Sequence, residues 1–239
     1  LKYSLHFEVF GASMVNNYAS TIYDQEHYIE ANLNIKNESF FEIFNKILHE
    51  REIKYIIPTH DEITFFLKKN ELKLIAPVVV SPKETCEIAL HKKKTYELIN
   101  NFDFSPIVYQ NIDTITKFPV FVKPNIGAGG KGTFISYDRK EIEGKFEHKA
   151  DSDFVIMEYL PGDEFTVECF TNSERQLLFC NARTRERITN GISFRSKRVS
   201  DNERFYNIAL QLNEKFSFRG YWFFQVKEDA SSKLKLLEF

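Results

Sequence analysis

FPVFVKPNIGAGGKGTFIS, residues 118–136, places four glycines and two lysines between two apolar runs. Glycines let backbone N–H groups approach phosphate oxygens without interference from a Cβ atom, and a nearby lysine supplies a positive charge. The stretch therefore predicts a loop that binds phosphate. The alternative at this point is a glycine-rich surface hairpin with a solvated lysine.

The sequence in and around the loop does not fit three common phosphate-binding architectures. Gly127, Gly129 and Gly132 satisfy the string GxGxxG, but the dinucleotide fingerprint needs a helix after it, and TFISY (133–137) is typical of a strand. The pattern GxxxxGK[ST] of the P-loop is absent, and so are the HRD and DFG motifs of protein kinases. We therefore expect a hairpin lid, entered by a strand that ends at Lys123.

Composition limits the classes of partner. The chain has 239 residues, 43% hydrophobic and 28% charged, which is typical of a globular protein with one or two domains. A net charge of −2 argues against a general nucleic-acid binder, and no apolar run reaches the roughly 18 residues of a membrane span. Cys86, Cys169 and Cys180 are odd in number, far apart and without CxxC spacing. They predict a reduced, cytoplasmic protein with neither a disulfide framework nor a zinc site.

The first part of the chain alternates between expected strands and expected helices. Strands are predicted at 5–10, 54–59 and 74–81. A helix over 40–48 is expected to begin with a capping box of Ser39 and Glu42, and a second helix is expected over 61–69. Strands that alternate with helices predict a parallel sheet, as in a Rossmann-like α/β domain.

The pattern changes after a polar connector at 100–106. Before it, a further helix is expected after Ser81, with Pro82 at its first position and Glu84 completing a second capping box. Beyond it, short strands separated by turn signals predict an α+β region that is mainly antiparallel, with one helix at 201–216.

DFVIMEYLPGDEFTVECF, residues 153–170, follows the glycine loop at a distance that suits a nucleotide site. An apolar strand ends at Glu158, Tyr159 and Leu160, turns through 161–163, and enters a second strand at Glu164. The strand end offers a slot for a purine, and a nearby carboxylate can accept hydrogen bonds from ribose hydroxyls. The alternative is a simple hairpin.

These segments, in this order, resemble the ATP-grasp superfamily. KPNIGAGGKGT, MEYLPGDEFTVE, a paired arginine segment, FFQV and LLEF carry the likeness, which is greatest to carboxylate–amine ligases of the carbamoyl-phosphate-synthase large-subunit type. Residues 1–85 also resemble the α/β domain that precedes the grasp in that superfamily. The resemblance implies a Rossmann-like pre-ATP-grasp domain over 1–85 and an α+β ATP-grasp domain over 86–239, with a lid subdomain at about 116–157.

The resemblance also implies roles for single residues. Lys92 and Lys123 match the lysines that reach the nucleotide phosphates, although the family often has Asp where this chain has His91. Without the family, the KKK run at Lys92 would indicate a solvated helix face. Other matched positions are the lid (Gly127, Gly129, Gly130, Lys131, Gly132), the adenine-side hinge (Glu158, Tyr159, Leu160), the ribose acid (Glu164) and the metal-binding positions (Gln225, Glu238).

RTRERITNGISFRSKR, residues 183–198, holds six basic residues and one acidic residue. Alternation along a strand would put Arg183, Arg185 and Arg187 on one face. Arg183 and Arg185 match the R-x-R of the family, which holds an anionic substrate or acyl phosphate; Arg187 has no match. An exposed basic strand and an RNA-binding patch are the alternatives.

The implied activity is an ATP-dependent ligase that joins a small carboxylate to an amine or ammonia through an acyl phosphate, with Mg²⁺ or Mn²⁺. No nucleic acid or membrane partner is expected, and the resemblance allows a homodimer. A catalytically silent nucleotide-binding or regulatory module is the alternative, and biotin- or bicarbonate-dependent carboxylation is a third interpretation.

Two departures concern the ends of the chain. The family places Asn two residues after the metal-binding glutamate, and this chain stops at Phe239, one residue short. It also lacks the opening strand and glycine turn of the family before Leu1. We therefore expect a fragment trimmed at both ends, with an incomplete metal site, that binds ADP or ATP with little turnover.

Overall fold

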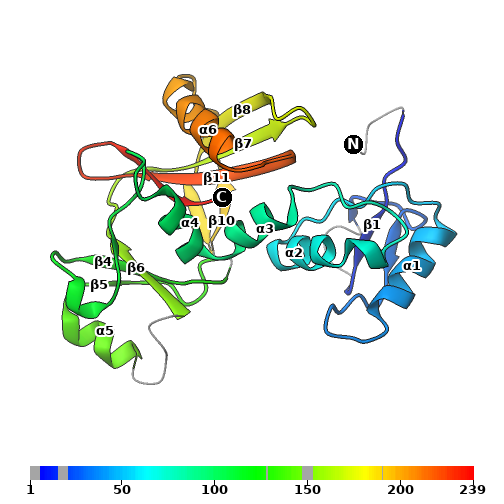
Figure 1. Cartoon of the computed structure of the whole chain (residues 1–239), viewed down its shortest axis with the longest axis horizontal. Coiled ribbons are helices and arrows are strands. Elements are labelled where there is room, and N and C mark those ends of the chain that lie inside the picture. Colours follow the sequence, from blue (N-terminus) through cyan, green and yellow to red (C-terminus); the bar gives the residue numbers. More distant parts are fainter. Residues whose placement is uncertain (1–5, 16–20, 128, 147–152, 190) are drawn as a thin grey trace. The chain divides into compact units, whose positions relative to one another are not determined.

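The computed structural model describes residues 6–15, 21–127, 129–146, 153–189 and 191–239 (Figure 1). The chain divides into two compact units: Leu1–Pro58 with Lys69–Val78, and Thr59–Lys68 with Val79–Phe239. None of the helices in the described ranges combines the length and the apolarity that a membrane crossing needs.

The first unit holds a small parallel sheet. Strands β1 (Gly11–Ser13) and β2 (Tyr28–Glu30) pair in parallel, and a single parallel bridge joins Ile56 to Val78. Helix α1 (Phe40–Glu50) buries one face, formed by Phe40, Phe44 and Leu48, and a 3₁₀ turn spans Glu71–Lys73. The predicted parallel pairing and the helix at 40–48 are confirmed.

The predicted strands of this unit are too long. Around Ile56 and Val78, Pro58 and Pro77 have no N–H group to donate to a ladder, so pairing shrinks to one bridge and the bond from Ile56 N to Pro77 O at 3.0 Å. The strand predicted at 5–10 is absent from 6–10, where Phe7 is exposed, and the strand lies at 11–13 instead. Residue 5 lies outside the described residues.

Both predicted capping boxes are wrong, although the helices that follow them are present. The Ser39 hydroxyl donates to Asn37 Oδ1 at 2.9 Å and makes no cap bond to α1. Helix α3 (Lys83–Leu90) begins after Pro82 instead of at it. The Ser81 hydroxyl accepts the Arg219 N–H at 3.2 Å, so it serves a tertiary contact in place of the helix end.

The second unit contains helices and two antiparallel four-stranded sheets. Three helices precede the sheets: α2 (Asp61–Lys69), α3, and α4 (Lys92–Ile99). The first sheet has the order β3 (Val108–Tyr109), β6 (Phe154–Glu158), β4 (Val120–Pro124), β5 (Phe134–Ser136), and α5 (Arg139–Phe146) packs on β5. A 3₁₀ turn spans Ile112–Thr114. As predicted, β4 and β5 form a hairpin around the glycine loop.

The second sheet has the order β12 (Leu234–Glu238), β11 (Gly220–Glu228), β7 (Glu164–Thr171), β8 (Leu177–Thr184). Helix α6 (Glu203–Lys215) packs on β7 and β8 (Figure 1). A small hairpin of β9 (Arg187–Thr189) and β10 (Ile192–Arg195) follows β8. The α+β, mainly antiparallel prediction and the helix at 201–216 are confirmed.

Two apolar clusters hold this unit together. The larger lies where α4, α6 and the second sheet meet, with Ile99, Phe205, Leu212 and Phe224 fully buried. The smaller lies between α5 and the first sheet, around Val120, Val122 and Ile142. Alternate residues of β4 and β11 enter these clusters, and the residues between them are left for the opposite face.

A polar network is buried at the far end of the second sheet. Trp222 Nε1 donates to Thr171 Oγ1 at 2.9 Å, and the Thr171 hydroxyl donates to Asn213 Oδ1 at 2.8 Å. Asn213 Nδ2 in turn donates to Arg175 O at 2.9 Å. The Thr171 hydroxyl thus bonds a side chain of β11 and a side chain of α6 at the same time.

We expect Thr171→Val to destabilise the protein by about 1–3 kcal/mol, because it leaves the indole N–H of Trp222 and the side-chain oxygen of Asn213 without these partners. Urea denaturation would measure the change. Thr171→Ser keeps the hydroxyl and is the matched control, with a smaller loss. A Val variant as stable as wild type would contradict the importance of the network.

Candidate functional site

A cavity of ≈ 460 Å³ lies in the second unit, between the two sheets and the start of α4. Its lining combines glycines, cations and carboxylates. The residues are Lys92, Phe121, Lys123, Pro124, Gly127, Gly129, Gly130, Lys131, Thr133, Glu164, Arg185, Ile188, Gly191, Gln225, Leu237 and Glu238. Most of the residues predicted from the sequence are thus brought together.

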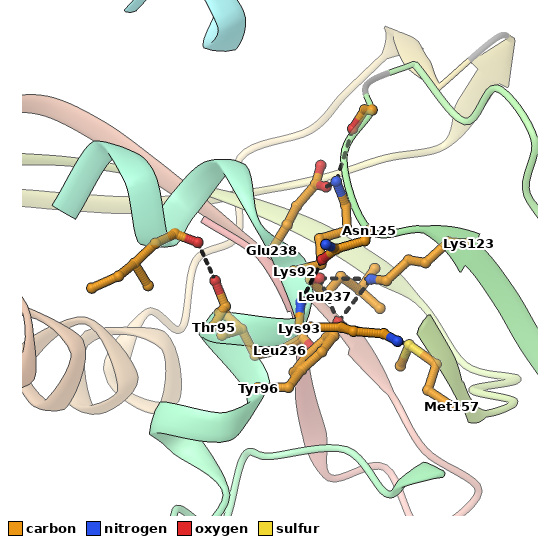
Figure 2. Close-up of polar contacts among 12 residues, drawn as sticks. Lys92, Lys93, Thr95, Tyr96, Lys123, Asn125, Met157, Leu236, Leu237 and Glu238 are labelled. Atoms are coloured by element: carbon orange, nitrogen blue, oxygen red, sulfur yellow. Dashed lines mark hydrogen bonds and ion pairs between the residues drawn. The ribbon is translucent and has the colours of Figure 1, made fainter. Parts of the chain in front are cut away.

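Lys92 reaches the cavity because α4 begins on the end of β4. The Lys92 N–H donates to Asn125 O at 3.1 Å, and the Lys93 N–H donates to Asn125 Oδ1 at 2.9 Å. The Lys92 side chain is buried; its Nζ donates to Gly127 O at 2.8 Å and lies 3.5 Å from Glu238 Oε2 (Figure 2). The KKK run is therefore not a solvated face at its first residue.

The Lys123 side chain projects from β4 into a buried cluster of hydrogen-bonding groups. Its Nζ donates to Tyr96 Oη and to Leu237 O, both at 2.7 Å, and the residue is only 5% exposed (Figure 2). Burial lowers the pKa of Lys123 to about 7, although the charge on Glu238 acts in the opposite direction. The ammonium is thus poised between its charged and neutral forms near neutral pH.

Tyr96 is the main residue that the sequence analysis missed. Its hydroxyl accepts from Lys123 and donates to Leu237 O at 2.6 Å, and burial raises the pKa of Tyr96 well above its usual value. Tyr96 lies four residues after Lys92, on the same side of α4. That spacing was a signal that the side chain would face the same site.

The glycine lid meets a second loop through backbone atoms. Gly129, Gly130 and Gly132 have φ values of 68°, 67° and 75°, which favour glycine. A Cβ atom on Gly191, in the β9–β10 turn, would lie 2.5 Å from the carbonyl carbon of Gly129. No local pattern in the sequence points to Gly191, because the contact joins segments about 60 residues apart and depends on a tertiary approach.

Arg185 and Glu164 face each other in the cavity wall. Arg185 Nε lies 2.8 Å from Glu164 Oε1, as an ion pair without hydrogen-bond geometry. Arg185 also donates to Thr166 Oγ1 at 3.1 Å and to Gly191 O. The arginine expected to hold an anion thus also ties the β9–β10 turn to β7.

Arg183 does not line the cavity. It donates to Glu168 Oε1 at 3.1 Å and to Ser196 Oγ at 3.0 Å, and its side chain is 35% exposed. The alternation that would put Arg187 beside it ends with β8 at Thr184; Arg187 lies exposed in β9. The prediction of one arginine face is therefore wrong beyond Arg185.

The hinge residues lie outside the cavity lining. Glu158 ends β6, and its Oε1 accepts the Ile107 N–H at 2.8 Å. Leu160 is buried in the larger apolar cluster. Contact of Tyr159 and Leu160 with a base stays a prediction, since it concerns their backbone groups.

Gln225 and Glu238 are direct partners in the pairing of β11 with β12, and both line the cavity. A register shift follows at Val226, so the hairpin is irregular next to the site. A carboxylate and an amide oxygen are hard donors that fit Mg²⁺. The described residues contain no group of three or more His, Cys, Asp or Glu side chains able to hold a metal ion.

Parts of the chain are similar to a known protein family and to curated ligases. Residues 150–239 match the family described as "ATP-grasp in the biosynthetic pathway with Ter operon". D-alanine–D-alanine ligase of Bacillus anthracis is 35% identical over 72 residues, which are 28% of this chain and 24% of that protein.

Solved structures share the fold. Carboxyaminoimidazole ribonucleotide synthase from Aspergillus clavatus, complexed with ATP, matches with a TM-score of 0.70 and 13% identity over 98% of this chain and 63% of that one. A second match is the biotin carboxylase domain of 2-oxoglutarate carboxylase from Hydrogenobacter thermophilus, complexed with MgADP, ADP and bicarbonate. Its TM-score is 0.68 and its sequence identity 14%, and the match covers 88% of this chain and 53% of that one. The chain thus spans about a quarter to two thirds of the length of these proteins.

The buried lysine makes stability depend on pH. Between pH about 7 and 10.5, the unfolded chain binds a proton at Lys123 that the folded chain lacks, so the free energy of unfolding rises with pH across this window. We expect urea midpoints to show this rise in wild type and much less of it in Lys123→Met. The exposed Lys140, changed to Met, is the control. Equal slopes in wild type and Lys123→Met would refute the assignment.

Proposed function

We propose that this chain, an ATP-grasp protein by its fold and by its family match over residues 150–239, binds ATP in the cavity and activates a carboxylate for attack by an amine or ammonia. The observation that carries the proposal is the convergence of Lys92, Lys123 and the glycine lid on one cavity. Two lysines from different elements and a row of glycines suit a polyphosphate better than a single anion.

The lysines would hold the phosphates. Lys92 is pinned by Gly127 O and Lys123 by Leu237 O, so both ammonium groups are oriented before a ligand arrives. A bound phosphate would favour the charged form of Lys123 and offset the cost of its burial. Backbone N–H groups of the lid, with Lys131 beside them, would cover the outer phosphate oxygens.

Glu238 and Gln225 would hold Mg²⁺. Both residues line the same cavity as the lysines, and Glu238 Oε2 lies 3.5 Å from Lys92 Nζ. The ion supplies charge neutralisation for the transferred phosphoryl group when it is bound. Lys92 lies close enough to Glu238 to set the position of its carboxylate.

The remaining residues would serve the nucleoside and the acceptor. Glu164 would accept from ribose hydroxyls, with the hinge at Glu158–Leu160 on the base side. Arg185, held between Glu164 and Gly191 O, would contact the carboxylate or its acyl phosphate. Arg183 would act from outside the cavity wall. No nucleic acid, no membrane, a cytoplasmic setting and a homodimer are further parts of the proposal.

No protein nucleophile is needed in this scheme. The γ-phosphoryl group passes to a carboxylate oxygen of the acceptor and ADP leaves; an amine then attacks the acyl carbon and phosphate leaves. The cavity contributes position and positive charge. The lysines, glycines and carboxylates that line the cavity suit these two tasks.

ATP binding tests the phosphate contacts. We expect Lys92→Ala and Lys123→Ala each to weaken ATP binding by roughly 1–3 kcal/mol in calorimetry, as for lost charge-assisted hydrogen bonds. Lys140→Ala, on the exposed face of α5, is the matched control. Unchanged affinity in both site variants would remove the basis for the nucleotide site.

Substrate-dependent ADP release by the full-length protein tests the reaction. We expect release that requires both a carboxylate and an amine, screened across amino acids and small acids, and a loss of at least about tenfold in Glu238→Gln. Glu143→Gln, exposed on α5, is the control. Binding of ATP without release under any condition would favour a silent nucleotide-binding module.

A further inference from the structure

Two of the three cysteines face each other across the second sheet. Cys169 of β7 and Cys180 of β8 are direct partners in the antiparallel register. Both side chains lie on the α6 side of the sheet, with the larger apolar cluster, whereas Glu164 and Thr166 lie on the side of the cavity and its arginine. The pair is therefore separate from the proposed nucleotide site.

The backbone hydrogen bonds show whether the two cysteines form a hydrogen-bonded or a non-hydrogen-bonded pair of the antiparallel ladder. The Arg185 N–H donates to Glu164 O, so odd-numbered residues of β8 direct their backbone groups toward β7. Cys180 O accepts from Asn202 Nδ2 at 2.8 Å, and Ala182 O accepts from the Val199 N–H, so even-numbered residues direct theirs away. Cys169 and Cys180 are thus a non-hydrogen-bonded pair.

That pairing suits a disulfide. Partners of this kind have Cα atoms about 4.5 Å apart and their side chains close together. Disulfides span Cα separations of roughly 4.4–6.8 Å, so the strands need no rearrangement for a bond to form. As direct cross-strand partners, the two cysteines direct their side chains to the same face of the sheet, next to each other.

The two thiols differ in access and in acidity. Cys169 is fully buried, whereas Cys180 is partly exposed on the last strand of its sheet. The neighbouring Cys169 thiol lowers the pKa of Cys180, and Asn202 Nδ2, 4.0 Å from its Sγ, acts in the same direction. The Cys180 thiol, together with burial, raises the pKa of Cys169. Cys180 is therefore the thiol that reacts first.

We propose that Cys169 and Cys180 form a reversible dithiol–disulfide pair, a modification site oxidised by low-molecular-weight disulfides such as oxidised glutathione. The Cys180 thiolate attacks one glutathione sulfur, and a glutathione thiolate leaves. Cys169 then loses its proton and attacks Cys180 Sγ, and the second glutathione leaves. Two protein thiols are oxidised to one disulfide, and one oxidised glutathione is reduced to two thiols.

Cys86 supplies an internal control. It is buried, burial raises the pKa of its thiol to about 11, and its Sγ donates to Ser81 O at 3.3 Å. No cysteine lies opposite it in the described residues. A reagent that oxidises exposed or acidic thiols should therefore spare Cys86.

The test titrates the folded chain with mixtures of reduced and oxidised glutathione, followed by quenching and peptide mapping without reductant. We expect one bond, Cys169 to Cys180, with Cys86 still free, and a melting temperature raised by roughly 5–10 °C that dithiothreitol reverses. Cys86→Ala should behave as wild type. Cys169→Ser should accumulate a glutathione adduct on Cys180, because the resolving thiol is gone.

Three results would overturn the proposal. One is the absence of the bond at every glutathione ratio in folded protein, with its appearance only after unfolding. Another is oxidation of Cys86 before Cys180. The third is a glutathione adduct on Cys169 in Cys180→Ser, which would show that the order of attack is wrong. Because Cys180 is only partly buried, we expect Cys180→Ser to disturb folding less than Cys169→Ser does.

Discussion

The carbonyl oxygen of Leu237 is the point on which the site depends. It accepts the ammonium of Lys123 from β4 and the hydroxyl of Tyr96 from α4, while its own strand carries Glu238 into the cavity. Three segments far apart in the chain therefore meet at one backbone atom. A buried ammonium is costly unless oxygens surround it, so this arrangement fixes the distance between the two sheets and the helix.

The cavity follows from that junction. Because α4 is tied to β12, Lys92 at its first turn lies beside Glu238 and under Gly127. The glycine lid then extends over the opening and meets the β9–β10 turn, which Arg185 holds against the second sheet. The two loops beside the site thus belong to different parts of the unit, and they approach each other closely at Gly129 and Gly191.

The sequence predicted what local pattern and chemistry determine. The glycine hairpin between two strands and Lys123 at its entry needed only short-range signals, and both are present. The predictions that failed, such as the two capping boxes, depended on which partners compete for a side chain. Ser39 and Ser81 have ideal capping chemistry, but Asn37 and Arg219 use their hydroxyls. Tyr96 and Gly191 act through contacts that exist only after distant segments meet.

Lys123 also makes the cavity an acceptor of protons. With a pKa of about 7, the free site holds the lysine largely neutral in mildly alkaline solution, and an anionic ligand would draw a proton from the buffer as it binds. Heat measured for binding would then include the ionisation heat of the buffer, and affinity for a phosphate would fall as pH rises above neutrality. A hydrogen ion would thus be a stoichiometric co-ligand of the nucleotide.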